Sequence, residues 1–171
     1  MIHQLNIYGK DKVQVAIERL KSFEPPEGYY LAFSGGKDSV VIKALADMAG
    51  VKYDAHYSLT SVDPPELVHF VKEFHDVQID APKDKDGNRV TMWNMIPKHK
   101  MPPTRGVRYC CKDLKEVGGQ GRMVITGVRW AESSNRKNNQ GEITVMAPKK
   151  KLKTELLDSG NFISTNKGGW C

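Results

Sequence analysis

The chain has 171 residues, of which 39% are hydrophobic and 27% charged; these values exclude an intrinsically disordered protein and fit one domain of ordinary size. No apolar run reaches the roughly 18 residues that a membrane-spanning helix needs, and the first residues lack the apolar stretch of a secretory signal. We therefore expect a cytoplasmic protein without a membrane partner.

The net charge of +6 has local sources. Four lysines gather between residues 149 and 153, and a second set is spread around the motifs described below: Arg105, Arg108, Lys112, Lys115, Arg129, Arg136 and Lys137. A pocket for a polyanionic small molecule explains these charges as well as a nucleic-acid surface does. Because the sequence contains no RNA- or DNA-binding signature, we expect a small-molecule nucleotide as the partner, with nucleic acid as the less favoured alternative.

The first part of the chain predicts a helix, a strand and a second helix. Apolar residues recur on one helical face over residues 11–23, and the prolines at 25 and 26 with Gly28 end that helix. The apolar run at 29–33 predicts a buried strand. Residues 38–48 predict the second helix, and Gly50 occupies the usual position after its C-terminus.

The same alternation continues through the middle of the chain. Strands are predicted at 51–58, 77–79 and 122–128, helices at 66–74 and 92–97, and two short strands at 142–146 and 161–164 could pair. Strands that alternate with helices imply a parallel sheet covered on both faces, so the expected fold class is three-layer α/β/α with a mostly parallel twisted sheet. We expect a single domain over 1–171, with its core at about 28–136 and an irregular region at 137–171 that could be incomplete.

The junction between the first strand and the second helix is the strongest candidate for a binding site. It consists of Ser34, Gly35, Gly36, Lys37, Asp38 and Ser39. Two glycines between a buried strand and a helix bring backbone N–H groups and the positive end of the helix dipole to one point, which favours an anion such as phosphate. Ser34 and Ser39 add hydroxyl donors and Lys37 adds a charge, whereas Asp38 suits Mg²⁺ or a helix cap better than the anion itself. The alternative is a simple tight turn.

Four segments together carry a family resemblance. They are the loop at 34–39, Ser-Val-Asp-Pro-Pro-Glu-Leu at 61–67, Arg-Tyr-Cys-Cys-Lys-Asp-Leu-Lys at 108–115, and Thr-Gly-Val-Arg-Trp-Ala-Glu-Ser at 126–133. In this order the chain resembles the phosphoadenosine phosphosulfate reductase family of the adenine-nucleotide α-hydrolase (PP-loop) superfamily, from about residue 29 to 136. The resemblance implies a Rossmann-like sheet that holds an adenine nucleotide (phosphoadenosine phosphosulfate, adenylyl sulfate or ATP) across the carboxyl ends of its strands. It also implies a thiol donor such as thioredoxin and is compatible with a homo-oligomer.

The same resemblance implies roles for particular residues. The loop at 34–39 would bind the phosphates, and Leu59 and Thr60 would approach the adenine or ribose through their backbone. Gly127 and Arg129 would contact a phosphate, with Arg136 as a second arginine, and Lys37 and Arg129 would be the catalytic residues. A planar guanidinium suits phosphate because it can bind it in bidentate fashion. The alternative for Arg129 is a surface ion pair with Glu132.

The three cysteines are Cys110, Cys111 and Cys171, an odd number that argues against a disulfide framework. In adenylyl-sulfate reductase relatives an adjacent cysteine pair supplies two of the four ligands of an iron–sulfur cluster, and a later Cys-x-x-Cys supplies the others. This chain has no such later motif. Cys110 and Cys111 are therefore interpreted as packed thiols in preference to half of an iron–sulfur site.

Three functions follow from these features. The first is thiol-dependent reduction of a sulfonucleotide, although the Glu-Cys-Gly type of catalytic segment found in family reductases is absent. The second is an ATP pyrophosphatase-type adenylation for sulfur transfer to nucleic acid, because the Ser-Gly-Gly-x-Asp-Ser form of the loop is the one found in ATP pyrophosphatases. The third is a nucleotide-binding module without catalysis of its own.

Overall fold

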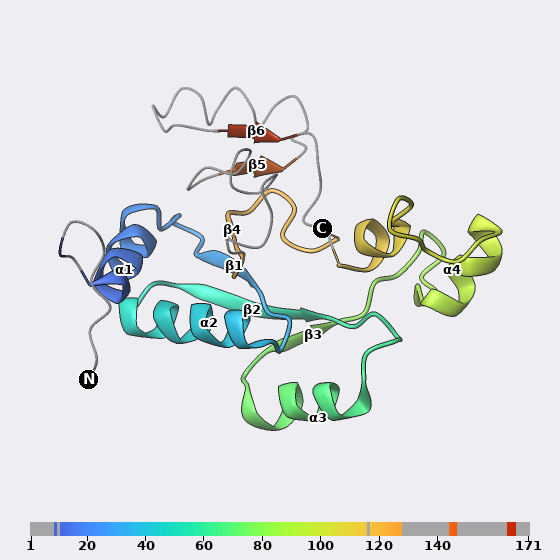
Figure 1. Ribbon diagram of the computed structural model, residues 1–171, viewed down its shortest axis with the longest axis horizontal. Coiled ribbons are helices and arrows are strands. Elements are labelled where there is room, and N and C mark those ends of the chain that lie inside the picture. Colours follow the sequence, from blue (N-terminus) through green and yellow to red (C-terminus); the bar gives the residue numbers. More distant parts are fainter. Residues whose placement is uncertain (1–8, 10, 116, 128–143, 147–163, 167–171) are drawn as a thin grey trace.

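The computed structural model describes residue 9 and residues 11–115, 117–127, 144–146 and 164–166, the last two segments as backbone (Figure 1). In chain order the elements are α1 (Lys12–Ser22), β1 (Tyr29–Ala32), α2 (Lys37–Ala49), β2 (Tyr53–Ser58), α3 (Pro65–Phe74), β3 (Gln78–Asp80), α4 (Met92–His99), the π-helical segment η1 (Cys111–Lys115), β4 (Val124–Ile125), β5 (Thr144–Met146) and β6 (Ser164–Asn166).

Local sequence signals set the ends of the helices. The carboxylate of Asp11 accepts a hydrogen bond from the Val13 amide at 3.1 Å and caps α1, while Gly50 ends α2 in a left-handed conformation with φ of 68°. A capping box formed by Thr91 and Asn94 begins α4. This helix runs through Pro97 to His99, two residues beyond the predicted end, so the proline does not terminate it.

The predicted parallel sheet is confirmed. Four strands pair in the order β3-β2-β1-β4, and every pair is parallel. Two late strands also pair, since β5 and β6 form a second, two-stranded parallel sheet. The predicted strand at 142–146 contains β5, but β6 lies at Ser164–Asn166 and shares only its first residue with the predicted strand at 161–164. The predicted strand at 122–128 is much shorter in the structure, because only Tyr30 and Leu31 of β1 pair with Val124 and Ile125.

One face of the sheet forms the main core. Its buried members include Leu31, Ala55 and Ile125, which lie in register across β1, β2 and β4. The chain passes from β1 to β2 through α2 and from β2 to β3 through α3, and both helices lie on this face (Figure 1). Both crossovers proceed in the same direction across the sheet, and right-handed crossovers then place their helices on the same side.

The opposite face of the sheet is polar. The alternating positions of β2 and β3 place Asp54, His56, Gln78 and Asp80 there, together with Tyr30 from β1. This departs from the continuous apolar pattern expected of a strand buried on both faces. The α/β class and the parallel sheet are therefore established, and the second helical layer of the three-layer arrangement remains a prediction.

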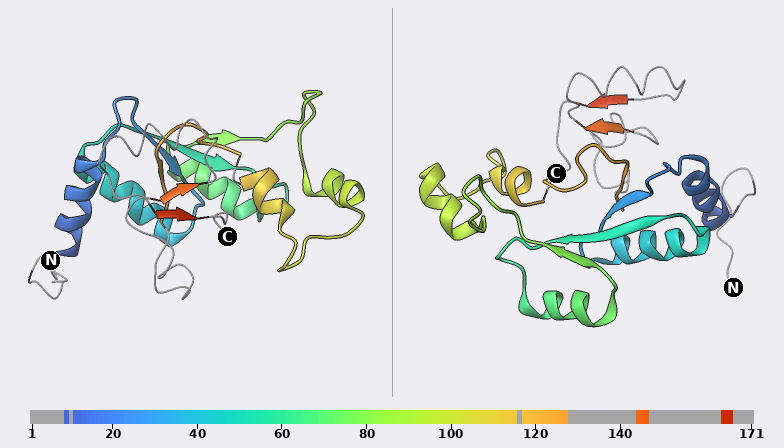
Figure 2. Two further views of the ribbon diagram at one scale, coloured as in Figure 1. Left: turned by 90° about the horizontal axis from the view of Figure 1, so that it is seen from above. Right: turned by 180° about the vertical axis from the view of Figure 1, so that it is seen from behind.

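The segment from 82 to 115, here called the β3–β4 lobe, has a small core of its own. Met95, Tyr109 and Leu114 are buried together, with Val90, Met92 and Cys110 packed against them. The lobe begins just after the carboxyl end of β3 and lies away from α1 and α2 in both further views (Figure 2). It is therefore a satellite of the main core and not an extension of it.

Within the described part of the chain, no helix combines the length and the apolar character needed to cross a membrane.

A matched pair of valine substitutions tests this core. Val71 of α3 is completely buried, whereas Val41 of α2 is 58% exposed. Val71→Ala is expected to lower the free energy of unfolding by about 2 kcal/mol, since it removes buried methyl groups and leaves a cavity. Val41→Ala is expected to change it by less than about 0.5 kcal/mol. Urea denaturation measures both values, and equal effects would contradict the assigned core.

Candidate functional site

Hydrogen bonds within the loop at 34–39 hold it in a closed turn. The Ser39 hydroxyl donates to the Gly36 carbonyl at 2.8 Å, and the Ser34 hydroxyl donates to Ser39 Oγ at 3.2 Å. The Gly36 amide donates to Ser34 Oγ at 3.4 Å. Ser39 is buried and Ser34 exposed, so Ser39 braces the turn and Ser34 is the serine on its accessible side.

Gly35 fits the loop against α3. Its φ of +73° lies in the left-handed region, and a Cβ at this position would lie 2.6 Å from Leu67 Cδ1 and 3.1 Å from Val71 Cγ2. Only glycine satisfies both conditions without strain. The identity of this residue is therefore required by the conformation of the chain and by the close approach of α3.

The loop leads directly into the N-terminus of α2. Gly36 is the N-cap residue, and because it has no side chain it supplies no N-cap side-chain hydrogen bond to the first turn, where the positive end of the helix dipole lies. Gly36 and Lys37 are exposed, and Asp38 lies in the first turn. Exposed backbone donors beside a mobile ammonium group are suited to an anion.

Gly127 brings the end of β4 against this loop. A Cβ on Gly127 would lie 2.8 Å from the carbonyl oxygen of Asp38 and 2.9 Å from its carbonyl carbon. Because the neighbouring atoms belong to the backbone, they cannot move aside as a flexible side chain could. The structure thus brings together two segments that the sequence assigned to one site, although 89 positions separate them.

The turn that follows β2 lies at the same edge of the sheet. The Leu59 amide donates to the Asp80 carbonyl at 2.8 Å, and the Thr60 amide donates to the Asp63 carboxylate at 2.7 Å. Ser61 adopts a positive φ of 69°, which is uncommon for a residue other than glycine and is frequent at functional sites. Thr60 is buried, and the Asp63 carboxylate holds its backbone in place within the turn.

Two of the predicted binding residues, Arg129 and Arg136, lie outside the described residues, as does Cys171. Cys110 and Cys111 lie in the β3–β4 lobe, and Cys110 packs against its core. Burial, reinforced by the neighbouring Cys111, raises the pKa of the Cys110 thiol. Among the described residues, no group of three or more His, Cys, Asp or Glu side chains could hold a metal ion.

Sequence analysis did not predict a polar network on the face of the sheet opposite the main core. His56 Nδ1 lies 2.8 Å from Asp80 Oδ2, and the Tyr30 ring stacks on His56 with centroids 4.3 Å apart. The Tyr30 hydroxyl donates to Asp80 at 3.3 Å. Burial, followed by the charge of Asp80, raises the pKa of Tyr30 to about 12. The sequence does place polar residues at alternate positions of β2 and β3, which indicates a polar face. This alternation does not show which side chains contact one another.

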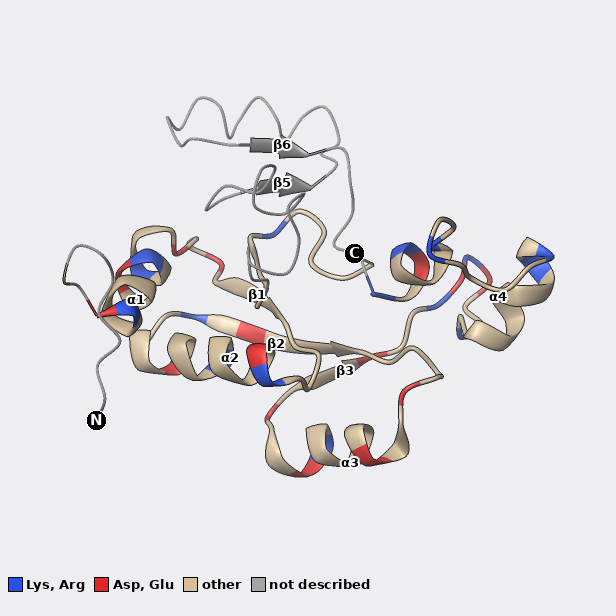
Figure 3. Cartoon of the chain, in the orientation of Figure 1, with Lys and Arg blue, Asp and Glu red and all other residues tan. Residues whose placement is uncertain are grey.

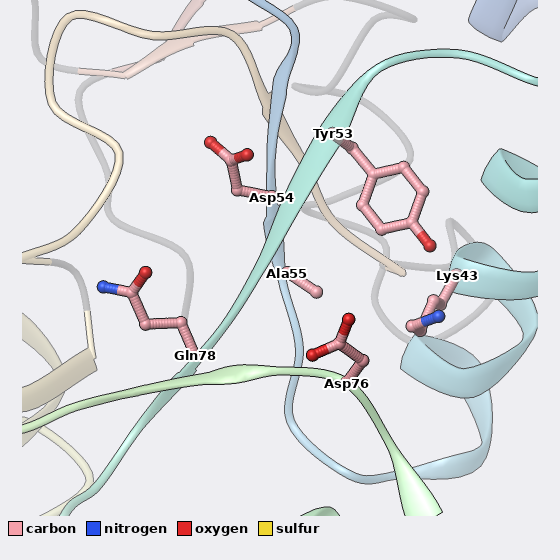
Figure 4. Close-up of a pocket in the computed structure, with 6 residues that line it drawn as sticks. All are labelled: Lys43, Tyr53, Asp54, Ala55, Asp76 and Gln78. Atoms are coloured by element: carbon pink, nitrogen blue, oxygen red, sulfur yellow. The ribbon is translucent and has the colours of Figure 1, made fainter.

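A shallow pocket of about 290 Å³ lies at the other end of the strands. It is lined by Lys43, Tyr53, Asp54, Ala55, Asp76 and Gln78 (Figure 4). The Tyr53 hydroxyl donates to Asp47, and Lys43 Nζ lies 3.3 Å from the same carboxylate. These contacts tie α2 to the start of β2. The loop at 34–39 follows the end of β1, which runs parallel to β2, so the pocket and the loop lie at opposite ends of the strands.

A pair of glycine substitutions tests the contact between Gly127 and Asp38. Gly127→Ala is expected to destabilise the protein by about 1–3 kcal/mol, because the new methyl group meets backbone atoms that cannot yield. Gly106→Ala is the control, since a Cβ there has no neighbour within 4 Å, and it is expected to be neutral or slightly stabilising. Urea denaturation compares the two variants. Equal stabilities would contradict the close approach of the two segments.

Comparison with protein-family models, with curated proteins and with solved structures finds no match to this chain. The nucleotide-binding assignment therefore rests on the sequence motifs and on the geometry described above.

Proposed function

We propose that this protein is an enzyme of the phosphoadenosine phosphosulfate reductase type, which binds an adenine nucleotide at the carboxyl edge of its sheet and takes part in thiol-dependent sulfonucleotide reduction. The observation that carries the proposal is the convergence of three segments on that edge. These are the closed loop at 34–39, the end of β4 at Gly127, and the turn at Leu59 and Thr60. Ligands of parallel α/β sheets bind outside the carboxyl ends of the strands.

Each segment has a distinct role in this proposal. The backbone amides of the loop and the uncapped end of α2 bind the phosphate groups, and Lys37 offsets their negative charge. The backbone of Leu59 and Thr60 borders the adenine or the ribose, and Gly127 lets the end of β4 approach the backbone of Asp38 at the start of α2. Arg129, two residues after Gly127, supplies a bidentate contact to phosphate, and Arg136 supplies a second charge. A second helical layer, on the face of the sheet opposite α2 and α3, completes the three-layer arrangement.

In the reductive reaction a thiolate attacks the sulfur of the sulfonucleotide. A bond forms between the two sulfur atoms, and the bond from that sulfur to the phosphate oxygen breaks. The adenosine phosphate leaves with the electron pair. A second thiol from a donor such as thioredoxin then attacks the first thiol's sulfur, forms a disulfide with it and displaces sulfite. The loop and Lys37 stabilise the charge that develops on the departing phosphate. The raised pKa of the Cys110 thiol makes it a poor attacking group at neutral pH.

The form of the loop favours a second candidate, ATP pyrophosphatase-type adenylation for sulfur transfer to nucleic acid. Asp38 lies in the first turn of α2 beside Lys37, where a carboxylate can hold Mg²⁺ on the phosphates of ATP. In that reaction an acceptor oxygen attacks the α-phosphorus, the bond from that phosphorus to the oxygen bridging the α- and β-phosphates breaks, and pyrophosphate leaves with the electron pair. Cys110 and Cys111 as part of an iron–sulfur site remain a subsidiary proposal for either activity.

Lys37→Ala tests nucleotide binding. Removal of an ammonium group from the phosphate site is expected to weaken binding about tenfold to a hundredfold, the usual effect of a lost hydrogen bond to a charged group. Lys21→Ala removes another exposed lysine, which lies on α1 outside the loop, and is expected to have no effect. Calorimetric titration with phosphoadenosine phosphosulfate, adenylyl sulfate and ATP with Mg²⁺ measures the affinities. Absence of binding by all three nucleotides would overturn the proposal.

Product analysis separates the candidate reactions. Reduction predicts sulfite from phosphoadenosine phosphosulfate with a thiol donor, and loss of that product in the Cys110→Ser, Cys111→Ser, Cys171→Ser triple variant. Adenylation predicts AMP and pyrophosphate from ATP, with strong dependence on Lys37 and Asp38. Nucleotide binding without either product would identify a binding module without catalysis and exclude both reactions.

A further inference from the structure

The β3–β4 lobe holds the entire excess of positive charge of the chain. Between residues 82 and 115 there are nine Lys or Arg residues and three Asp, which gives +6, the formal net charge of the whole protein. The remainder of the sequence therefore carries equal numbers of acidic and basic residues. Figure 3 shows this charge on α4, on η1 and on the loops that join them. The nine are Lys83, Lys85, Arg89, Lys98, Lys100, Arg105, Arg108, Lys112 and Lys115.

The basic side chains of the lobe face solvent. All nine side chains are exposed. Asp113 lies 3.8 Å from His99, and the Asp84 carboxylate accepts backbone amides within its own turn at 2.8 and 3.0 Å. No ion pair between described residues joins an Asp or Glu to any of the nine. Such a surface attracts a polyanion.

An exposed aromatic side chain lies within this surface. Trp93 of α4 is 71% exposed, while Met95 of the same helix is 3% exposed in the core of the lobe. The Asn94 side chain donates to the Arg89 carbonyl at 2.9 Å and so holds Arg89 beside the first turn of α4. Lys98 follows in the last turn. A large ring between basic residues can stack on an unpaired base while the cations bind the adjoining phosphates.

We propose that the β3–β4 lobe binds single-stranded nucleic acid, with its phosphates on the basic side chains and a base stacked on Trp93. Paired bases inside a duplex do not offer their faces to such a ring. An anionic membrane would need a broad apolar face on α4, but this helix turns Met92 and Met95 into the core of the lobe. The proposal is independent of the nucleotide site, since none of its residues belongs to the loop at 34–39.

Substitution of Trp93 tests the stacking. The probes are single-stranded RNA and DNA of one sequence, about 12 nucleotides long, a length that one binding module covers. Trp93→Ala is expected to weaken binding of the preferred strand about tenfold, while Trp93→Phe retains most of the affinity because it retains a ring. Binding is expected to quench tryptophan fluorescence in the wild type and much less in Trp93→Phe. Equal affinities of the wild type and Trp93→Ala would overturn the stacking, and tighter binding of the duplex would do the same.

Charge reversal tests the phosphate contacts. Lys98→Glu with Lys112→Glu is expected to lower the affinity at least tenfold and to reduce the salt dependence by about 1.4 in slope, from about 0.7 for each lost contact. Lys21→Glu with Lys72→Glu makes the same change in net charge on α1 and α3, where both lysines are exposed, and is expected to leave the affinity nearly unchanged. Equal losses in the two double variants would overturn the proposal, as would binding to anionic vesicles without binding to either oligonucleotide. Lys37→Ala is expected to retain full affinity, so failure at the nucleotide site is distinguishable from failure here.

Discussion

The pairing of β1 with a parallel strand on each side is the constraint on which the candidate site depends. Because β2 and β4 both run in the direction of β1, their carboxyl ends reach the edge where the loop at 34–39 begins. An antiparallel neighbour on either side would place a strand's amino end beside the loop. The approach of Gly127 to Asp38 follows directly from this arrangement. The loop at 34–39, Gly127 and the turn after β2 therefore lie at the same edge of the sheet, although they are distant in sequence.

The two faces of the sheet differ in polarity and in what they contribute to the fold. One face buries Leu31, Ala46 and Val71 between strands and helices and supplies the apolar burial that stabilises the fold. The other face carries a hydrogen-bonded group of Tyr30, His56 and Asp80. Since buried polar groups need partners, each member of that group restricts the orientation of the others. Stability and polar organisation thus come from opposite sides of the same strands.

The sequence predicts most elements because their signals are local. The Asp11 cap, the left-handed Gly50 and the apolar run at 29–33 each act within a few residues, and the helices and strands that they mark were found near the expected positions. The strand at 122–128 was overestimated because only the part of it that meets β1 forms a ladder. The extension of α4 through Pro97 was missed, because a proline within a helix usually ends it.

The parts of the site that sequence could not supply depend on distant partners. The loop at 34–39 is visible as a contiguous motif, and its closed turn follows from residues five apart. The pairing of His56 with Asp80 joins two strands, and no periodicity indicates which acidic residue meets which histidine. The separate core of the lobe around Tyr109 and Leu114 is equally hidden, because its members come from segments with little apolar pattern. The excess positive charge can be assigned to one surface only after the structure shows that residues 82–115 form a separate lobe.

A hydrogen bond between described residues connects the turn after β2 with the β3–β4 lobe. The Met92 amide at the start of α4 donates to Ser61 Oγ at 2.9 Å, and Ser61 belongs to the turn with positive φ that follows β2. A hydrogen bond of this kind contributes about 1 kcal/mol. The hydrogen bond restrains the turn and the start of α4 together. A ligand that orders one of them therefore lowers the entropic cost of ordering the other. By thermodynamic linkage, the same free energy acts in both directions between the sheet edge and the lobe.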